Sequence, residues 1–467
     1  DAVYAPGTVI ISASGEVSDV KKVIEPTLSD EEDTSLILVD FSKGKFELGG
    51  SSFAQVLNKI GDVSPTVNDD EYFARAFNTV QKLINEGQVL AGHAVSSGGL
   101  ITTLLEMNFA NAKGGLNINF SSLEEKDIIK ILFSEIAAVV IQVKNSSAVV
   151  SEFGKNGIHA HIIGTPINKR KVFIKHHGAE LNFDIDEMRD VWYKTSYLLD
   201  QKQSTEKLAT ERFETYKKTI LDYKFPKNFT GKLSDYAAEH GRKNRTGVKA
   251  AIIREKGVNG DREMAYSLFL AGVDVKDIHM TDLIAGREDL SDVNMIVYVG
   301  GFSNSDVLGS AKGWAGAFLY NPKAKQALDS FYARPDTLSL GVCNGCQLMM
   351  ELGLIESKGA TQPMQHNASG KFESGYLNVE IPENNSVMLN SLAGSQLGIW
   401  VAHGEGRFLF EGAEEDYNIS MKYTGSHYPA NPNLSEFNTA AICSNNGRHL
   451  AMMPHLERII FPWQAAH

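Results

Sequence analysis

Cysteine is scarce in this sequence, and so are long apolar runs. The 467 residues include only three cysteines, at positions 343, 346 and 443, which excludes a disulfide framework of the kind found in small secreted proteins. The longest apolar run, Ile136 to Val143, has the length of a core strand. A membrane-spanning helix needs about 20 mostly apolar residues, so the sequence predicts no membrane partner.

An excess of basic residues is also missing. Lys and Arg number 45 against 57 Asp and Glu, giving a net charge of −12, so we expect no nucleic-acid partner. The balance of 43% hydrophobic and 22% charged residues is typical of globular enzymes, and we expect a cytoplasmic one of two or three domains. The sequence starts at Asp1 and runs almost directly into an expected strand, Thr8 to Ser12, which suggests a part of a longer polypeptide.

One segment combines a strand pattern, a cysteine and a helix pattern. Thr337 to Val342 is a short apolar run typical of a buried parallel strand, and Gln347 to Leu354 is rich in helix formers. Cys343 lies between them, where a helix N-terminus favours negative charge and lowers the pKa of a thiol. Gly341 and Gly345 flank it, as a sharp nucleophile turn requires. Cys343 is therefore a candidate nucleophile.

A candidate base follows a second strand pattern more than a hundred residues later. His449 to Met453 is an expected strand that Pro454 stops, and His455 and Glu457 come next. Residues i and i+2 of an extended segment point to the same side, so Glu457 can orient the His455 ring toward Cys343. Taken singly, a buried cysteine and a His beside a Glu are common structural features; the combination points to nucleophilic catalysis.

The spacing of Cys343 and Cys346 leaves two other interpretations open, a redox pair or half of a zinc site. A zinc site needs two more ligands, and the remaining cysteine, Cys443, is not part of a second such pair. A redox pair is expected near the start of its domain, whereas this one lies about a hundred residues in. We interpret Cys346 as a core residue and expect no metal site.

The Gly-x-Cys-x-Gly and His-x-Glu motifs together resemble the Cys-His-Glu triad of class I glutamine amidotransferases. Longer strings are similar to the glutaminase domain of the phosphoribosylformylglycinamidine synthase family. They are REKGVNGDREMA at 254–265, GGFSNSDVLG at 300–309, GVCNGCQLM at 341–349, VAHGEGRF at 401–408 and GRHLAMMPHLER at 447–458. The resemblance implies that Cys343, His455 and Glu457 are catalytic.

The alternation of strand and helix patterns from Gly247 onward predicts a doubly wound, mainly parallel sheet whose site lies at the carboxyl ends of its strands. Gly301 ends one strand, and its backbone N–H could join that of Asn344 in an oxyanion hole. The resemblance implies that Gln347 and His403 contact the substrate glutamine.

The first part of the chain also alternates strand and helix, with expected strands that include Ser35 to Asp40. It also resembles the synthase family, in the C-terminal subdomain of its second aminoimidazole-ribonucleotide-synthetase-like half, through the strings SLILVDFSKGKFELGG at 35–50 and AGHAVSSGGL at 91–100. Carboxylates that this family uses are replaced by Ala94 and Ser97, so we expect a structural role here, with a bound nucleotide at most. The glycine-rich turns at 49–52 and 93–100 are either phosphate cradles or plain turns.

Charged segments of helical composition follow Phe183, which predicts a helical connector. We therefore expect an α/β protein with a synthetase-like α+β subdomain at 1–180, a connector at 181–245 and a glutaminase domain at 246–467.

The resemblance implies that the glutaminase domain hydrolyses glutamine and supplies ammonia for amidation of formylglycinamide ribonucleotide. ATP and magnesium would be cofactors of the full-length enzyme, and none is required by the triad. Formylglycinamide ribonucleotide and ATP would bind mostly through a part that this chain lacks. Two other hypotheses stay open: another Cys-His-Glu hydrolase without glutamine specificity, and a non-catalytic scaffold.

Overall fold

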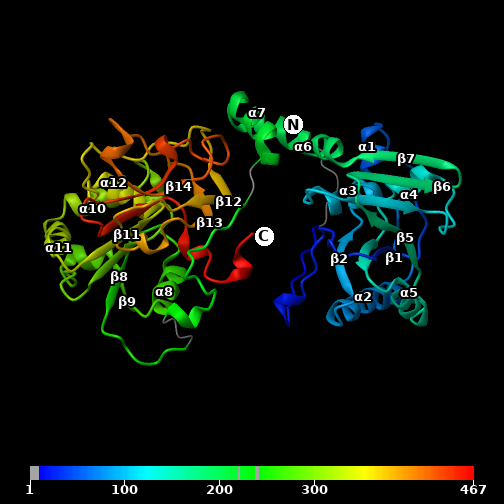
Figure 1. The fold of residues 1–467 in the computed structure, drawn as a ribbon, viewed down its shortest axis with the longest axis horizontal. Coiled ribbons are helices and arrows are strands. Elements are labelled where there is room, and N and C mark those ends of the chain that lie inside the picture. The colour runs from blue at the N-terminus through cyan, green and yellow to red at the C-terminus, as the bar shows by residue number, and fades with distance from the viewer. Residues whose placement is uncertain (1–9, 219–220, 237–240, 467) are drawn as a thin grey trace, which may run out of the picture. The chain divides into compact units, whose positions relative to one another are not determined.

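The computed structural model describes residues 10–218, 221–236 and 241–466 (Figure 1). Contacts divide the chain into two compact units, residues 1–195 and 196–467, with the boundary inside helix α6 (Ile185–Gln203). The three-part division at residues 180 and 245 stays a prediction. Ile10 to Ser12 form no strand, and the rest of the strand expected at Thr8 to Ser12 lies outside the described residues. No described helix has both the length and the apolar character to span a membrane.

The first unit is built on a seven-stranded sheet of order β2-β4-β1-β5-β3-β6-β7, in which only the β3–β6 pairing is parallel. The strands are β1 (Ser35–Asp40), β2 (Val89–Ala94), β3 (Gly115–Asn119), β4 (Ala138–Val143), β5 (Ala160–Ile167), β6 (Lys171–His176) and β7 (Ala179–Asp184). The helices are α1 (Ser52–Val56), α2 (Asp70–Asn85), α3 (Gly99–Phe109), α4 (Ile128–Phe133) and α5 (Ser146–Lys155).

The unbroken apolar run of β1 follows from its central place in this sheet. Leu36 and Leu38 lie in a core cluster with residues of α3 and α4, whereas Ile37 and Val39 lie in a second cluster with residues of α2 and α5. Because successive side chains of a strand point to opposite faces, both faces of the sheet are covered. A strand buried on both faces is expected to be apolar along its length, without polar residues at every second position.

The second unit begins with the end of α6 and with α7 (Glu206–Thr215), so the predicted connector is helical here. The first residues of the connector, as far as Asp184, belong instead to β7, and the described residues from 221 to β8 contain no α-helix. The nine strands of the second unit have the order β13-β12-β14-β15-β16-β11-β10-β8-β9. They are β8 (Lys249–Arg254), β9 (Asp274–His279), β10 (Met295–Tyr298), β11 (Leu338–Val342), β12 (Glu373–Glu380), β13 (Gln396–His403), β14 (Asn418–Tyr423), β15 (Thr439–Cys443) and β16 (His449–Met452). The helices are α8 (Asp261–Leu270), α9 (Met280–Ala285), α10 (Lys312–Leu319), α11 (Pro322–Ala333) and α12 (Asn344–Glu351).

The expected α/β fold class is confirmed. The five strands from β9 to β16 pair in parallel, while β16, β15, β14, β12 and β13 pair antiparallel. The parallel half positions the candidate site through its register. Tyr298 of β10 pairs with Gly341 of β11, and Val342 of β11 pairs with Met452 of β16. The carboxyl ends of three strands therefore lie side by side, although they are far apart in the sequence.

Candidate active site

The candidate nucleophile lies in the turn between β11 and α12. Cys343 has φ 53° and ψ −106°, an unusual conformation for a residue other than glycine. Its N–H donates to the carbonyl of Met452 (2.9 Å), and its carbonyl accepts from the N–H of Gln347 (3.0 Å). The thiol thus projects from a turn that is fixed on both sides, as the sequence predicts.

The glycines beside the turn are required by packing. A Cβ at Gly345 would lie 2.0 Å from the carbonyl oxygen of Tyr298, and a Cβ at Gly341 would lie 2.5 Å from the carbonyl oxygen of Gly345. Both clashes are with backbone atoms, so no rotation of a side chain relieves them. The glycines therefore let α12 approach β10 and β11 closely.

The candidate base follows β16. His455 Nδ1 lies 2.6 Å from Glu457 Oε1, and the side chains are only 1% and 2% exposed. The expected contact is present, but its expected cause is wrong in part. Only His455 is extended, while Glu457 lies in a 3₁₀ turn (Leu456–Arg458). The N–H of His455 donates to the carbonyl of Trp400 (2.8 Å), which anchors this segment to β13.

His455 and Cys343 meet beside Gly300. A Cβ on Gly300 would lie 2.8 Å from His455 Cε1 and 3.4 Å from Cys343 Cβ, so glycine leaves room for both side chains. Burial by itself lowers the pKa of His455, but hydrogen bonds and charges of Cys343 and Glu457 outweigh it and raise the pKa to about 9. His455 is therefore protonated at neutral pH. Since Nδ1 is engaged by Glu457, Nε2 is the nitrogen available to Cys343, whose thiol donates to the carbonyl of Ala402 (3.5 Å).

The two residues open into a cavity of about 520 Å³ within the second unit. Of the residues that the sequence singles out, Cys343, His455, Gly301, Gln347 and His403 line it. Glu457 and Asn344 do not line it and contact residues that do. The cavity also has lining residues that sequence reasoning missed: Asn259, Phe302, Asp306, Ser310, His366, Gly370, Lys371, Phe372, Ser374, Ala402, Gly404, Glu405 and Arg458. Glu405 and Arg458 belong to strings quoted for the resemblance, whereas residues 366–372 carry no motif signal.

The expected oxyanion-hole residues both stand at strand ends. Gly301 has φ 123°, and a Cβ there would lie 2.6 Å from Val258 Cα and from Asn259 N. Asn344 is the first residue of α12, so its N–H has no acceptor within the helix. The Asn344 side chain accepts from Ser303 N–H (3.3 Å) and thereby joins this turn to the segment after Gly301. The assignment of these two N–H groups to an oxyanion hole stays a prediction.

The two expected substrate contacts are themselves held in place. Gln347 Nε2 donates to the carbonyl of Glu405 (2.6 Å), and Gln347 Oε1 accepts from Asn344 Nδ2 (2.8 Å). His403 Nδ1 lies 3.2 Å from Asn367 Oδ1. Burial, and then the charge of His455, lowers the pKa of His403 to about 3, so this ring is neutral and cannot compete with His455 for a proton.

Among the described residues, no group of three or more His, Cys, Asp and Glu side chains is arranged to hold a metal ion. All three cysteines are free thiols. Cys346 is buried in the core of the second unit, and this burial raises the pKa of its thiol well above the usual value. Burial also raises the pKa of Cys443. Neither thiol is suited to react as a thiolate.

Comparison with known proteins identifies two family regions. Residues 247–467 match the CobB/CobQ-like glutamine amidotransferase domain, and residues 36–177 match the C-terminal domain of AIR synthase related proteins. The probable phosphoribosylformylglycinamidine synthase of Arabidopsis thaliana, a chloroplastic/mitochondrial protein, is 38% identical over 99% of this chain. The human phosphoribosylformylglycinamidine synthase is 36% identical over 100% of it. The chain is therefore similar over nearly its whole length to phosphoribosylformylglycinamidine synthases.

The chain spans about a third of the length of these relatives, 34% of the Arabidopsis protein and 37% of the human one. Among solved structures, PurLQS from Thermotoga maritima is 25% identical and matches 47% of this chain and 92% of its own, with a TM-score of 0.40.

Proposed function

We propose that the second unit is the glutaminase of a phosphoribosylformylglycinamidine synthase. The observation that carries this proposal is the buried arrangement of Cys343, His455 and Glu457 at one end of a glutamine amidotransferase domain. A strained turn presents the thiol, a protonated imidazole stands beside it, and a buried carboxylate fixes that imidazole. This combination is the general logic of nucleophile, base and orienting acid.

In the proposed reaction, the Cys343 thiolate attacks the side-chain amide carbon of glutamine. The backbone N–H groups of Gly301 and Asn344 stabilise the oxyanion that forms. When the carbon–nitrogen bond breaks, His455 gives its proton to the leaving ammonia, and a γ-glutamyl thioester remains. Water then loses a proton to His455 and attacks the thioester, which releases glutamate and restores the thiolate. Gln347 and His403 shape the pocket that receives the glutamine side chain.

For the whole family member, we propose that ammonia amidates formylglycinamide ribonucleotide at the expense of ATP, with magnesium, in purine biosynthesis. The described residues of the first unit do not fit a phosphate group at the two glycine-rich turns. Glu135 Oε1 accepts hydrogen bonds from Ser52 N–H (2.8 Å) and Gly98 N–H (2.9 Å), so a carboxylate already occupies these donors. We therefore derive no step of ATP chemistry from this unit. A cytoplasmic location belongs to the proposal, although the Arabidopsis relative is a chloroplastic/mitochondrial protein.

An electrophilic glutamine analogue tests the glutaminase. The chain is treated with the analogue, with and without excess glutamine, and the adduct is mapped by peptide mass spectrometry. We expect one adduct per chain on Cys343, protection by glutamine, and no adduct on Cys346 or Cys443, which serve as internal controls. Labelling without glutamine protection would favour another Cys-His-Glu hydrolase. Equal labelling of the three cysteines would refute the proposal and favour a scaffold.

A further inference from the structure

Residues 366–373, which lead into β12, form one wall of the cavity. We call them the wall segment. Its residues His366, Gly370, Lys371 and Phe372 line the cavity directly. Its last residue, Glu373, begins β12 and is buried. The position of this segment therefore sets the shape of the pocket.

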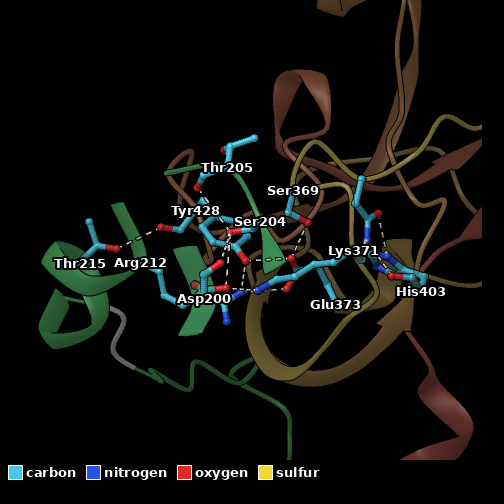
Figure 2. A network of polar contacts seen from close by, with 11 residues as sticks. Asp200, Ser204, Thr205, Arg212, Thr215, Ser369, Lys371, Glu373, His403 and Tyr428 are labelled. Atoms are coloured by element: carbon cyan, nitrogen blue, oxygen red, sulfur yellow. Dashed lines mark hydrogen bonds and ion pairs between the residues drawn. The ribbon is translucent and has the colours of Figure 1, made fainter. Parts of the chain in front are cut away.

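The connector helices hold the wall segment through a cluster of charges (Figure 2). Lys371 Nζ pairs with Asp200 Oδ1 of α6. Arg212 Nη2 of α7 pairs with Glu373 Oε2 (2.9 Å) and also contacts the hydroxyl of Tyr428. Two acids thus face two bases, and both ion pairs hold the C-terminal end of the segment, at Lys371 and Glu373.

The two acidic residues of the cluster are buried, so the rules for buried charges apply to it. Asp200 and Glu373 are among the buried residues, and burial raises the pKa of Glu373 despite hydrogen bonding by Ser369 and the charges of Arg212 and Lys371. Buried ion pairs add little net stability because removing charges from water is costly. Their best-attested effect is to select one arrangement over others. Here that arrangement is the wall segment against α6 and α7.

The wall segment is in turn joined to the candidate substrate contacts. Asn367 Nδ2 donates to the carbonyls of Lys371 (3.0 Å) and His403 (2.7 Å). Asn367 Oδ1 accepts from Gly406 N–H (3.1 Å) and lies 3.2 Å from His403 Nδ1. A shift of Lys371 would therefore move groups on both sides of the pocket.

From these contacts we propose that Asp200 and Arg212 are positioning residues for glutamine binding, which act by fixing the wall segment as one side of the pocket. The inference rests on the proposed glutaminase function. Neither residue lines the cavity, so neither acts on the reacting atoms. Sequence reasoning assigned no role in the chemistry to the connector, because the contacts join residues more than 150 positions apart.

Three variants and one matched control test this inference in the whole chain. Arg212→Met keeps the apolar stem and removes the charge, Asp200→Asn keeps the shape, and Arg212→Lys keeps the charge. The control is Arg242→Met: Arg242 is part of an ion pair with Asp274 (2.8 Å) in the same unit, its side chain is 12% exposed, and it does not line the cavity. Any general loss of stability from breaking an ion pair should appear in the control too.

We expect Arg212→Met and Asp200→Asn to raise KM for glutamine about ten-fold and to leave kcat within about three-fold of the wild-type value. The expected effect on KM is smaller than the roughly hundred-fold loss of rate that a 1 Å misplacement of reacting groups can cause. Arg212→Lys should recover most of the affinity, and Arg242→Met should leave KM unchanged. Deuterium uptake by peptides covering residues 366–373 should rise in Arg212→Met and Asp200→Asn and stay unchanged in Arg242→Met.

Three results would overturn the inference: unchanged uptake in the wall segment, raised uptake with an unchanged KM, or equal effects in Arg242→Met and Arg212→Met. If the wild-type chain does not turn over glutamine, alkylation of Cys343 by the glutamine analogue replaces KM as the measure of binding. If Cys343 is not alkylated either, the proposed function fails, and the deuterium measurement still decides whether the connector fixes the wall segment.

Discussion

Gly345 offers a direct test of how the nucleophile turn is built. In Gly345→Ala the new Cβ would lie 2.0 Å from the carbonyl oxygen of Tyr298 and 2.5 Å from its carbonyl carbon. Both atoms are backbone of β10, which pairs with a strand on each side, and Tyr298 is itself fully buried. Either β10 or the start of α12 must move, because real Cβ contacts are never this short. Movement of α12 would also displace Cys343.

The expected cost follows from the rigidity of the neighbours. Overpacking of a protein core costs typically about 1–3 kcal/mol, and a clash that only backbone movement relieves belongs at the upper end of this range, so we expect about 3 kcal/mol. The matched control is Gly375→Ala in β12, where no atom lies within 4 Å of the new Cβ and φ is not positive. Its effect should stay within about 0.5 kcal/mol.

Urea unfolding followed by tryptophan fluorescence measures this difference, since Trp314, Trp400 and Trp463 lie in the second unit and only Trp192 in the first. A lower midpoint at an unchanged slope would report a loss of stability. Labelling of Cys343 by the glutamine analogue should fall in Gly345→Ala and not in Gly375→Ala. If the two variants unfold at the same midpoint, the clash with Tyr298 does not determine the stability of the turn and the reasoning is wrong.

Three further predictions concern ionisable groups. The pKa of His403 is about 3 in the folded chain and ordinarily 6.5, so the unfolded chain takes up a proton first on acidification, and the stability that neutral His403 contributes is lost. The free energy of unfolding should fall by about 2 kcal/mol between pH 7 and 5. In urea unfolding, His403→Gln should make the free energy of unfolding less dependent on pH over this range. The pKa of His455 is raised to about 9, partly by Glu457, so His455 loses its proton only as the pH rises through 9. Glu457→Gln should therefore move the alkaline limit of glutamine hydrolysis to lower pH. A limit that stays in place in the pH–rate profile would contradict the role of Glu457. Glu135→Gln should destabilise the first unit by about 1–3 kcal/mol in thermal unfolding, because two charge-assisted hydrogen bonds to backbone N–H groups are weakened.

The parts of the site that sequence reasoning found are those encoded by short segments. The apolar run of β11, the single cysteine after it and the helix formers of α12 indicate a nucleophile turn without any knowledge of distant contacts. The same holds for β1, whose predicted bounds, Ser35 to Asp40, are those observed. In both places local propensity and tertiary packing favour the same structure, so the structure can be predicted from the sequence.

The parts that sequence reasoning missed depend on contacts between distant segments. The wall segment and the charges of Asp200 and Arg212 have no periodicity and no motif, and on a helix such charges ordinarily indicate a solvated face. Asp200 is buried and Arg212 is half-buried, and Lys371 and Glu373 compensate their charges. The antiparallel half of the sheet was missed for a similar reason, since its strands pair across loops of variable length.

The first unit shows how one side chain can decide between two interpretations of a glycine-rich turn. The glycine-rich turns at 49–52 and 93–100 have the composition of phosphate cradles, and the backbone N–H groups of Ser52 and Gly98 do converge on an anion. That anion is the chain's own Glu135, whose pKa is lowered because these N–H groups outweigh the effect of its burial. A phosphate at this place would have to displace a bonded carboxylate of like charge. The carboxylate ties two turns of the unit together, which favours the structural interpretation of both.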